Sequence, residues 1–435
     1  MESFMPQDLC LHLESFTSDV EILYFAALFI VICLIAQYRL MWRDFPLATQ
    51  GVACEDAEAD KKEVNTSKKN GWDNEGTGVS IVMPVEEDDG SLKENLLSLL
   101  SQTCETRHEV IVVDEHPGGT VAELVKSLQK DDGRLRYTYV PTSARFIELR
   151  KLSLTLGIRA ARASWVIIVS STTRPKERGW LKNFCSHLSP DYDFVSAYVN
   201  YNDDGTSQAR RCIYERLQAQ LLRMRAYKCC FLLGTEPTNY AIRKEWFMEN
   251  EGFADSLFLP MGEESILVNR HAEPERSLLL LDSGTAATEE LPERRTQRKL
   301  RIGREAVATH LRGGATLFRW RNAWAHVFFE LFVLSSPIYA ALRILKDWPS
   351  RHYSTEAAIP DGLVSVSVIA FLMLPPLLLM KSTKRLEERA FCFYIYVNAA
   401  LHPFRKLLSH SSCQKMAKQT HKRAIDYDIN AESAS

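Results

Sequence analysis

The chain has 435 residues, and its 53 Lys and Arg against 55 Asp and Glu give a formal net charge of −2. This near balance excludes a strongly basic nucleic-acid-binding protein. Hydrophobic residues at 46% and charged residues at 25% exclude a wholly disordered chain. The ten cysteines form no C-x-x-C pair, so the sequence predicts neither a disulfide scaffold nor a zinc site, and we interpret Cys229 and Cys230 as buried thiols.

An apolar, uncharged run near the N-terminus predicts a membrane anchor over residues 22–43. With its flanks the run is long enough to span a hydrocarbon core of about 30 Å. Residues 1–21 contain no Lys or Arg, whereas Arg39 and Arg43 follow the run, so the positive-inside rule predicts a short extracytoplasmic N-terminus. A signal peptide is the alternative, but the required basic start is missing. Residues 44–78 are polar and predict a linker.

Two further apolar runs, at residues 323–345 and 362–380, predict a transmembrane hairpin. Basic residues precede the first run and follow the second, which predicts that both ends of the hairpin face the cytosol. A shorter apolar stretch at 390–404 has basic residues on both flanks and is interpreted as interfacial or re-entrant. Residues 405–435 predict a polar cytosolic tail.

Between the anchors, short apolar runs alternate with helical periods. The pattern predicts strands at 79–83, 109–113, 135–140 and 165–169, and helices after a capping box at Ser91 and Glu94 and over 120–130 and 147–163. This alternation predicts an α/β domain with a mostly parallel, Rossmann-like sheet. Ligands of such sheets bind beyond the carboxyl ends of the strands. Dinucleotide, P-loop, kinase and zinc-protease motifs are absent from the sequence.

The first strand and its end read VSIVMPVEE, the next helix reads LKENLLSLLSQT, and the second strand reads EVIVVDE. These segments resemble family 2 glycosyltransferases, which are inverting enzymes of the GT-A fold. In that family the first strand typically reads V-S-[IV]-[IV]-[IV]-P-V-[YF]-N-E, and the helix and second strand match the motifs that follow. Residues 151–161, Arg174 with Pro175, and residues 239–247 resemble a membrane-anchored bacterial subgroup. The resemblance covers about residues 79–310.

The resemblance implies a GT-A domain in the cytosol of a multi-pass protein of the cell inner (cytoplasmic) membrane. The implied reaction transfers a sugar from a nucleotide-diphosphate sugar to a cell-envelope glycan, and the implied acceptor is a membrane lipid or lipid-linked glycan. Partner glycosyltransferases are possible, and no nucleic acid is implied. The residues implied to bind the nucleotide-sugar follow the strands: Pro84, Val85, Glu86, Asp114, Lys151, Ser170, Thr172 and Arg174.

One motif departs from the family. Its metal-binding D-x-D aligns with Ser170, Ser171 and Thr172, so the position that would hold Mg²⁺ or Mn²⁺ carries hydroxyls, which are weak ligands. The sequence therefore predicts no metal ligand at Thr172. Either a carboxylate from elsewhere fills the gap, with Glu86 and Glu115 as candidates, or nearby cations take over the neutralisation of the diphosphate.

The catalytic carboxylate of the family aligns with Glu264, which with Glu263 opens a predicted helix. The alternative is that both acids only complement the helix macrodipole. Asp114, implied to read the base, has the alternative of capping a turn. Gln297 and Arg298, implied to lie near the acceptor or diphosphate, have the alternative of a basic stripe against anionic lipid. Two hypotheses stay open: an active glycosyltransferase, and a catalytically inactive pseudo-glycosyltransferase that acts as a binding or scaffold protein.

Overall fold

The computed structural model describes residues 78–87, 90–141 and 149–312, together with residues 28, 32, 314, 317, 318, 324, 373, 377, 383, 384 and 386–388. The chain divides into two compact units, and the α/β domain belongs to the unit that includes Ala48–Phe318. Within the described residues no helix has both the length and the apolar character needed to cross a membrane. The predicted membrane segments at 22–43, 323–345, 362–380 and 390–404 lie almost entirely outside these residues and stay predictions.

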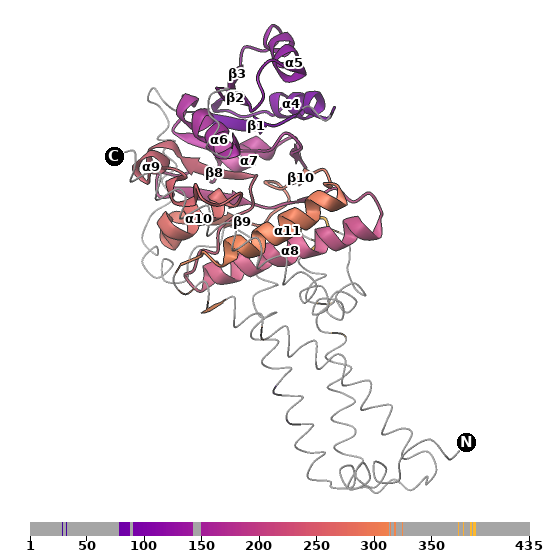
Figure 1. Ribbon diagram of the computed structural model, residues 1–435, viewed down its shortest axis with the longest axis vertical. Helices are drawn as coiled ribbons and strands as arrows, with labels where there is room; N and C mark the ends of the chain where they lie inside the picture. Colours follow the sequence, from indigo (N-terminus) through magenta and orange to yellow (C-terminus); the bar gives the residue numbers. More distant parts are fainter. Residues whose placement is uncertain are drawn as a thin grey trace, which may run out of the picture. The chain divides into compact units, whose positions relative to one another are not determined.

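A seven-stranded, mostly parallel sheet forms the centre of the domain, with the strand order β3-β2-β1-β4-β8-β6-β9 (Figure 1). Only β8 in this sheet runs antiparallel to its neighbours. The strands are β1 (Gly78–Val85), β2 (Arg107–Asp114), β3 (Leu135–Tyr139), β4 (Trp165–Ile168), β6 (Phe194–Ala197), β8 (Tyr240–Arg243) and β9 (Ser277–Leu280). A small second sheet has the order β5-β10-β7 and consists of β5 (Arg174–Pro175), β10 (Ala287–Glu289) and β7 (Val199–Tyr201).

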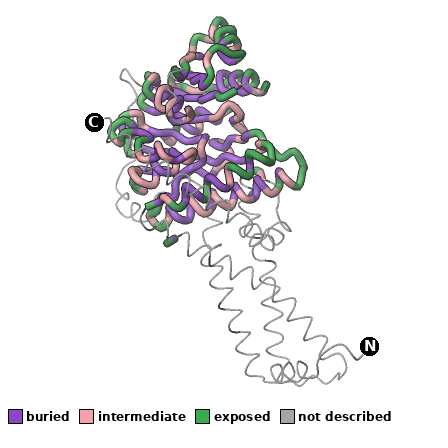
Figure 2. Tube along the Cα trace, viewed as in Figure 1, coloured by how far each residue is buried: buried purple, intermediate pink, exposed green. Residues whose placement is uncertain are grey.

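The central strands are buried on both faces, as their continuous apolar runs require. In β1, Ile81 and Met83 point into one hydrophobic cluster and Val82 into the other. Helices α4 (Leu92–Leu100), α5 (Thr120–Gln129) and α7 (Trp180–Cys185) contribute to the first cluster. Helices α6 (Leu149–Ala160), α9 (Lys244–Glu249) and α10 (Glu263–His271) contribute to the second. Figure 2 shows the resulting buried layer along the strands.

Two long helices, α8 (Ser207–Lys228) and α11 (Arg294–Ala308), lie beside each other in the lower part of the domain in Figure 1. Their contact is supported by the Sγ of Cys212, which donates a hydrogen bond of 3.1 Å to Oε1 of Gln297. Two short 3₁₀ helices, η4 (Ala254–Ser256) and η5 (Pro274–Arg276), complete the described elements.

The predicted strands and helices of residues 79–169 are confirmed within a few residues, but two details are wrong. Ser91 makes no side-chain cap for α4: its hydroxyl accepts a hydrogen bond from Nδ2 of Asn95 at 3.3 Å, and Glu94 pairs with Arg174. Cys229 is exposed and Cys230 is disulfide-bonded, so neither is an ordinary buried thiol.

Candidate functional site

The site lies where the strand order reverses, between β1 and β4. From β1 the chain moves outward to β2 and β3, and α6 then returns it to β4 on the other side of β1. Such a switch point opens a crevice at the carboxyl ends of the two strands. The last bond between them joins Val169 N to Val82 O at 3.1 Å. Pro84 has no N–H with which to extend the ladder, so β4 diverges from β1 after Val169.

The antiparallel strand β8 brings a further segment to the same edge. Because β8 runs in the opposite direction, its first residue lies opposite the last residue of β4, and Tyr240 pairs with Ile168. Asn239 adopts a left-handed conformation with φ of 60° and donates its N–H to Ile168 O. Asn is among the few residues that tolerate this conformation. Residues 235–239 therefore lie beside the turn that follows β4.

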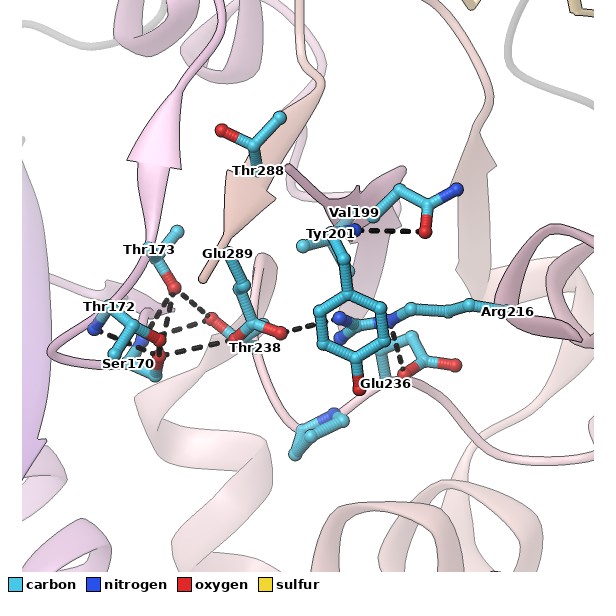
Figure 3. Close-up of polar contacts among 12 residues, drawn as sticks. Ser170, Thr172, Thr173, Val199, Tyr201, Arg216, Glu236, Thr238, Thr288 and Glu289 are labelled. Atoms are coloured by element: carbon cyan, nitrogen blue, oxygen red, sulfur yellow. Dashed lines mark hydrogen bonds and ion pairs between the residues drawn. The ribbon is translucent and has the colours of Figure 1, made fainter. Parts of the chain in front are cut away.

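That turn carries the aligned Ser170 and Thr172 and forms a cluster of hydroxyls (Figure 3). The N–H of Ser170 donates to the hydroxyls of Thr173 and Thr238, at 2.9 and 3.0 Å. The Oγ of Ser170 lies 3.0 Å from Oγ1 of Thr172 and donates to Oε1 of Glu289 at 3.1 Å. The carboxylate that reaches this position thus comes from β10, and not from Glu86 or Glu115.

Glu289 connects the hydroxyls to a buried ion-pair network (Figure 3). Its Oε2 accepts a hydrogen bond from Arg216, whose Nε donates to Glu236 at 2.9 Å. Arg216 is 2% exposed and lies over the ring of Tyr201, 4.5 Å from its centroid. Arg223 pairs with the other oxygen of Glu236. Although burial opposes ionisation, Arg223, Arg216 and Arg304 lower the pKa of Glu236 to about 2.

This arrangement does not fit the divalent metal that the resemblance implies. Such an ion requires several anionic oxygen ligands. Here the hydroxyl cluster has one carboxylate, and that carboxylate is already paired with Arg216. Across the described part of the chain, no three His, Cys, Asp or Glu residues form a group that could hold a metal.

Two acids at the start of α10 lie on the other side of residues 235–239. Glu263 accepts a 3.0 Å hydrogen bond from Arg150, which also donates to Pro237 O at 2.9 Å. Glu264 is 4% exposed, and burial together with the charge of Glu263 raises its pKa to about 8, against the opposing charge of Arg150. Glu264 is therefore a carboxyl group that titrates near neutral pH, as a general base requires.

Gly262 fixes the start of this helix. It has a φ of 81°, a conformation that favours glycine. A Cβ atom there would lie 2.5 Å from Cγ2 of Val307 in α11. The sequence Gly262-Glu263-Glu264 thus places the two acids at a helix start that is held closely against α11.

Helix α6 supports both sides of the site. Lys151 is buried, and its Nζ donates to Leu259 O, so it holds the segment before α10. Ser153 donates to Glu115 at 2.7 Å, at the end of β2. Burial raises the pKa of Glu115. Gly157 allows α6 to approach the sheet, because a Cβ there would lie 2.4 Å from Cγ1 of Val82.

Asp114 at the end of β2 is almost fully buried and uses both carboxylate oxygens. One accepts from the N–H of His116 at 3.0 Å, and the other from the hydroxyl of Tyr137 at 2.8 Å. The first bond is the turn cap that the sequence left open as the alternative for this residue. Pro84 and Val85 are buried at the end of β1, whereas Glu86 is exposed.

Three other candidates lie in different surroundings. Arg174 donates to Asn95 at 2.7 Å and pairs with Glu94, and Asn95 in turn donates to Ser171 O at 2.6 Å. Gln297 is buried and donates to Pro292 O at 2.6 Å within its own segment. Arg298 is exposed on α11. Within the described residues, neither Gln297 nor Arg298 has a hydrogen bond or ion pair with the strand ends.

The sequence missed Arg216, Glu236 and Glu289. They come from α8, the segment before β8, and β10, far from Ser170 in sequence, and no motif marked them. One available signal was the lone Glu236 between Thr235 and Pro237 in a largely uncharged segment.

The sequence matches no protein-family model, and it matches no curated protein. Among solved structures, the mannosyltransferase PcManGT from Pyrobaculum calidifontis, in complex with GDP-Man and Mn²⁺, is similar at 15% identity, with a TM-score of 0.46 over 93% of this chain and 97% of that chain. Residues 1–349 of TarS from S. aureus, in complex with UDP-GlcNAc, are similar at 16% identity, with a TM-score of 0.39 over 76% of this chain and 92% of that chain.

Proposed function

We propose that the protein is an inverting glycosyltransferase of the family 2 type that uses a nucleotide-diphosphate sugar. The observation that carries the proposal is the buried Glu264, whose pKa is raised to about 8 and which lies at the start of α10. A chain of contacts runs from its neighbour Glu263 through Arg150 and Pro237 to Thr238 and Ser170 at the strand edge.

In the proposed reaction Glu264 takes the proton of an acceptor hydroxyl. The acceptor oxygen then bonds to the anomeric carbon of the donor while the bond to the diphosphate breaks, and the nucleoside diphosphate leaves with the bonding electron pair. A single displacement of this kind inverts the anomeric configuration. The burial that raises the pKa of Glu264 also increases its basicity toward the hydroxyl.

We further propose that the acceptor is a membrane lipid or a lipid-linked glycan, that the product is a cell-envelope glycan, and that the protein resides in the inner membrane with this domain in the cytosol. The basic residues flanking the apolar runs support this topology. Recovery in the membrane fraction after an alkaline carbonate wash would test it. Partner glycosyltransferases are proposed on the resemblance alone.

The test uses the full chain in detergent or native membranes. GDP-Man and UDP-GlcNAc are the first donors to try, because the similar structures hold them. Acceptor-dependent release of a nucleoside diphosphate that is lost in Glu264→Gln would support the proposal. Release that Glu264→Gln leaves unchanged would contradict it.

The second candidate function is a catalytically inactive binding protein. The hydroxyls of Ser170 and Thr172 in place of metal-binding carboxylates favour it. Nucleotide binding without turnover of any donor would distinguish this function from the first.

A further inference from the structure

The surroundings of Ser170 favour a fixed positive charge over a bound divalent cation. Within the described residues, Glu289 is the one carboxylate that hydrogen-bonds to this hydroxyl cluster, through Oγ of Ser170. An ion that bound Glu289 would lie beside the guanidinium of Arg216, which occupies the other carboxylate oxygen. Two positive charges on one carboxylate repel each other, and the low exposure of the site weakens solvent screening.

Arg216 is held in place. Its Nε donates to Glu236 at 2.9 Å, its guanidinium lies over the Tyr201 ring, and its side chain is 2% exposed. Moving it away to admit a metal would leave Glu236 and Glu289 without this shared partner in a buried site, which is strongly unfavourable.

The network carries a net positive charge. Arg216 and Arg223 pair with Glu236 and Glu289, which leaves these four residues neutral. Arg304 of α11 adds a third guanidinium, near enough to Glu236 and Tyr201 to affect both their pKa values. Glu264 also lies near Glu236, but its raised pKa of about 8 keeps it largely uncharged at neutral pH. Three positive charges against the two carboxylates therefore give the strand edge a positive potential, which attracts a diphosphate.

We propose that the protein binds the diphosphate of a nucleotide without a divalent metal. The diphosphate contacts the hydroxyls of Ser170 and Thr172, and the arginine cluster of Arg216, Arg223 and Arg304 supplies the charge that a metal would otherwise bring. This inference rests on the proposed function. It assigns Glu289 the opposite role from a metal ligand, because its negative charge opposes diphosphate binding.

The experiment measures the Kd of UDP and of GDP for the full chain in detergent by titration calorimetry, with EDTA and then with Mn²⁺ or Mg²⁺. We expect the Kd of the nucleotide that binds to agree within about twofold between the two conditions. Glu289→Gln, which removes a negative charge at constant size, is expected to bind as tightly as the wild type or up to about threefold more tightly. If Glu289 were a metal ligand, Glu289→Gln would instead lose nucleotide binding.

Arg304→Gln tests the cluster at an exposed position, where folding is not at risk, and is expected to weaken binding by about three- to tenfold. Arg295→Gln, exposed on the same helix, is the matched control and is expected to leave Kd unchanged. Circular dichroism melts show that each variant is folded. Binding that EDTA abolishes and Mn²⁺ restores, or loss of binding in folded Glu289→Gln, would overturn the inference. If UDP and GDP bind under neither condition, the proposed function itself fails.

Discussion

Nε of Arg150 donates a hydrogen bond to Oε1 of Glu263 at 3.0 Å, and the next acid, Glu264, has no ion-pair partner among the described residues. The two neighbouring carboxylates therefore differ in their environments. Glu263 is held as part of the support of α10, while Glu264 keeps a raised pKa. A buried carboxyl group with a raised pKa is typical of sites where an acid exchanges a proton.

Glu264→Gln is expected to reduce sugar transfer by at least about 100-fold, because it removes the proposed base. The Kd for nucleotide is expected to stay the same, since the change lies at the acceptor side. Donor turnover and nucleotide titration measure the two effects separately. Glu275→Gln, an exposed acid beyond the end of α10, is the control. Equal loss of binding and turnover would argue for a structural role of Glu264 instead.

Stability is expected to depend on pH through the same residue. The pKa of Glu264 is about 8 in the folded protein and about 4.5 in the unfolded chain, so the folded state holds the proton more tightly. The contribution of this residue to the free energy of unfolding is complete below pH 4.5 and is lost as pH rises through about 8. At about 1.4 kcal/mol per pH unit, the upper limit of this loss is about 4 to 5 kcal/mol.

Urea unfolding at several pH values between these limits would measure this loss. Glu264→Gln cannot ionise, so the variant is expected to gain stability relative to the wild type as pH rises. A difference between the two proteins that does not change with pH would contradict the raised pKa.

Gly262→Ala is expected to destabilise the domain by about 2 to 4 kcal/mol, through its left-handed φ and a new contact with Val307. Gly90→Ala is the matched control: its φ is 86°, but a Cβ there meets nothing within 4 Å, so only about 1 to 2 kcal/mol is expected. The double variant Gly262→Ala with Val307→Ala should recover part of the loss. Equal costs for the two glycines would show that the contact with α11 is unimportant.

Arg216→Ala is expected to cost about 3 to 5 kcal/mol of unfolding free energy, because it leaves Glu236 and Glu289 buried without their shared partner. Lys182→Ala removes an exposed pair with Glu105 and is expected to cost less than about 1 kcal/mol. Denaturant melts of both variants give the comparison. Similar small costs would mean that the buried network contributes little.

Cys104 is expected to be the most reactive free thiol among the described cysteines. A hydrogen bond from Cys185 is the main cause that lowers its pKa to about 5, so it is a thiolate at neutral pH. Limited alkylation with iodoacetamide near pH 6.5, followed by mass spectrometry, should label Cys104 before the exposed Cys229. Cys185→Ser is expected to slow this labelling. Preferential labelling of Cys229 would contradict the hydrogen-bonded pair.

The sequence predicted the strands and helices of the first half of the domain, because each of them is marked by a local apolar pattern. Alternating apolar runs predicted β1, β2, β3 and β4. Because the carboxyl ends of parallel strands lie at one edge of a sheet, the sequence also placed Pro84, Asp114 and Ser170 at that edge. It did not predict the reversed β8 or the short β10, because these strands pair with segments distant in sequence. The capping box failed for the same reason: Arg174, 80 residues away, attracts the Glu94 carboxylate that would otherwise cap α4.

Of the acids in the candidate site, Glu263 and Glu264 were singled out from the sequence, whereas Glu236 and Glu289 and their arginine partners were not. Glu263 and Glu264 follow a glycine at a helix start, and such a local pattern can be recognised in the sequence without knowledge of the tertiary packing. Glu289 lies 119 residues from Ser170, and Arg216 reaches it from a third element, so their meeting depends on tertiary packing. Lys151, by contrast, had a suitable charge but is used to bind Leu259 O.

The reversed direction of β8 makes one segment serve both the site and the stability of the sheet. Residues 235–239 reach the crevice before the strand begins, and their contacts are held at one end by Tyr240, which pairs within the sheet. Glu236 of this loop pairs with Arg216 and Arg223, and Asn239 donates its N–H to Ile168 O of β4. Substitutions in the loop are therefore expected to change the lining of the crevice and the free energy of unfolding together.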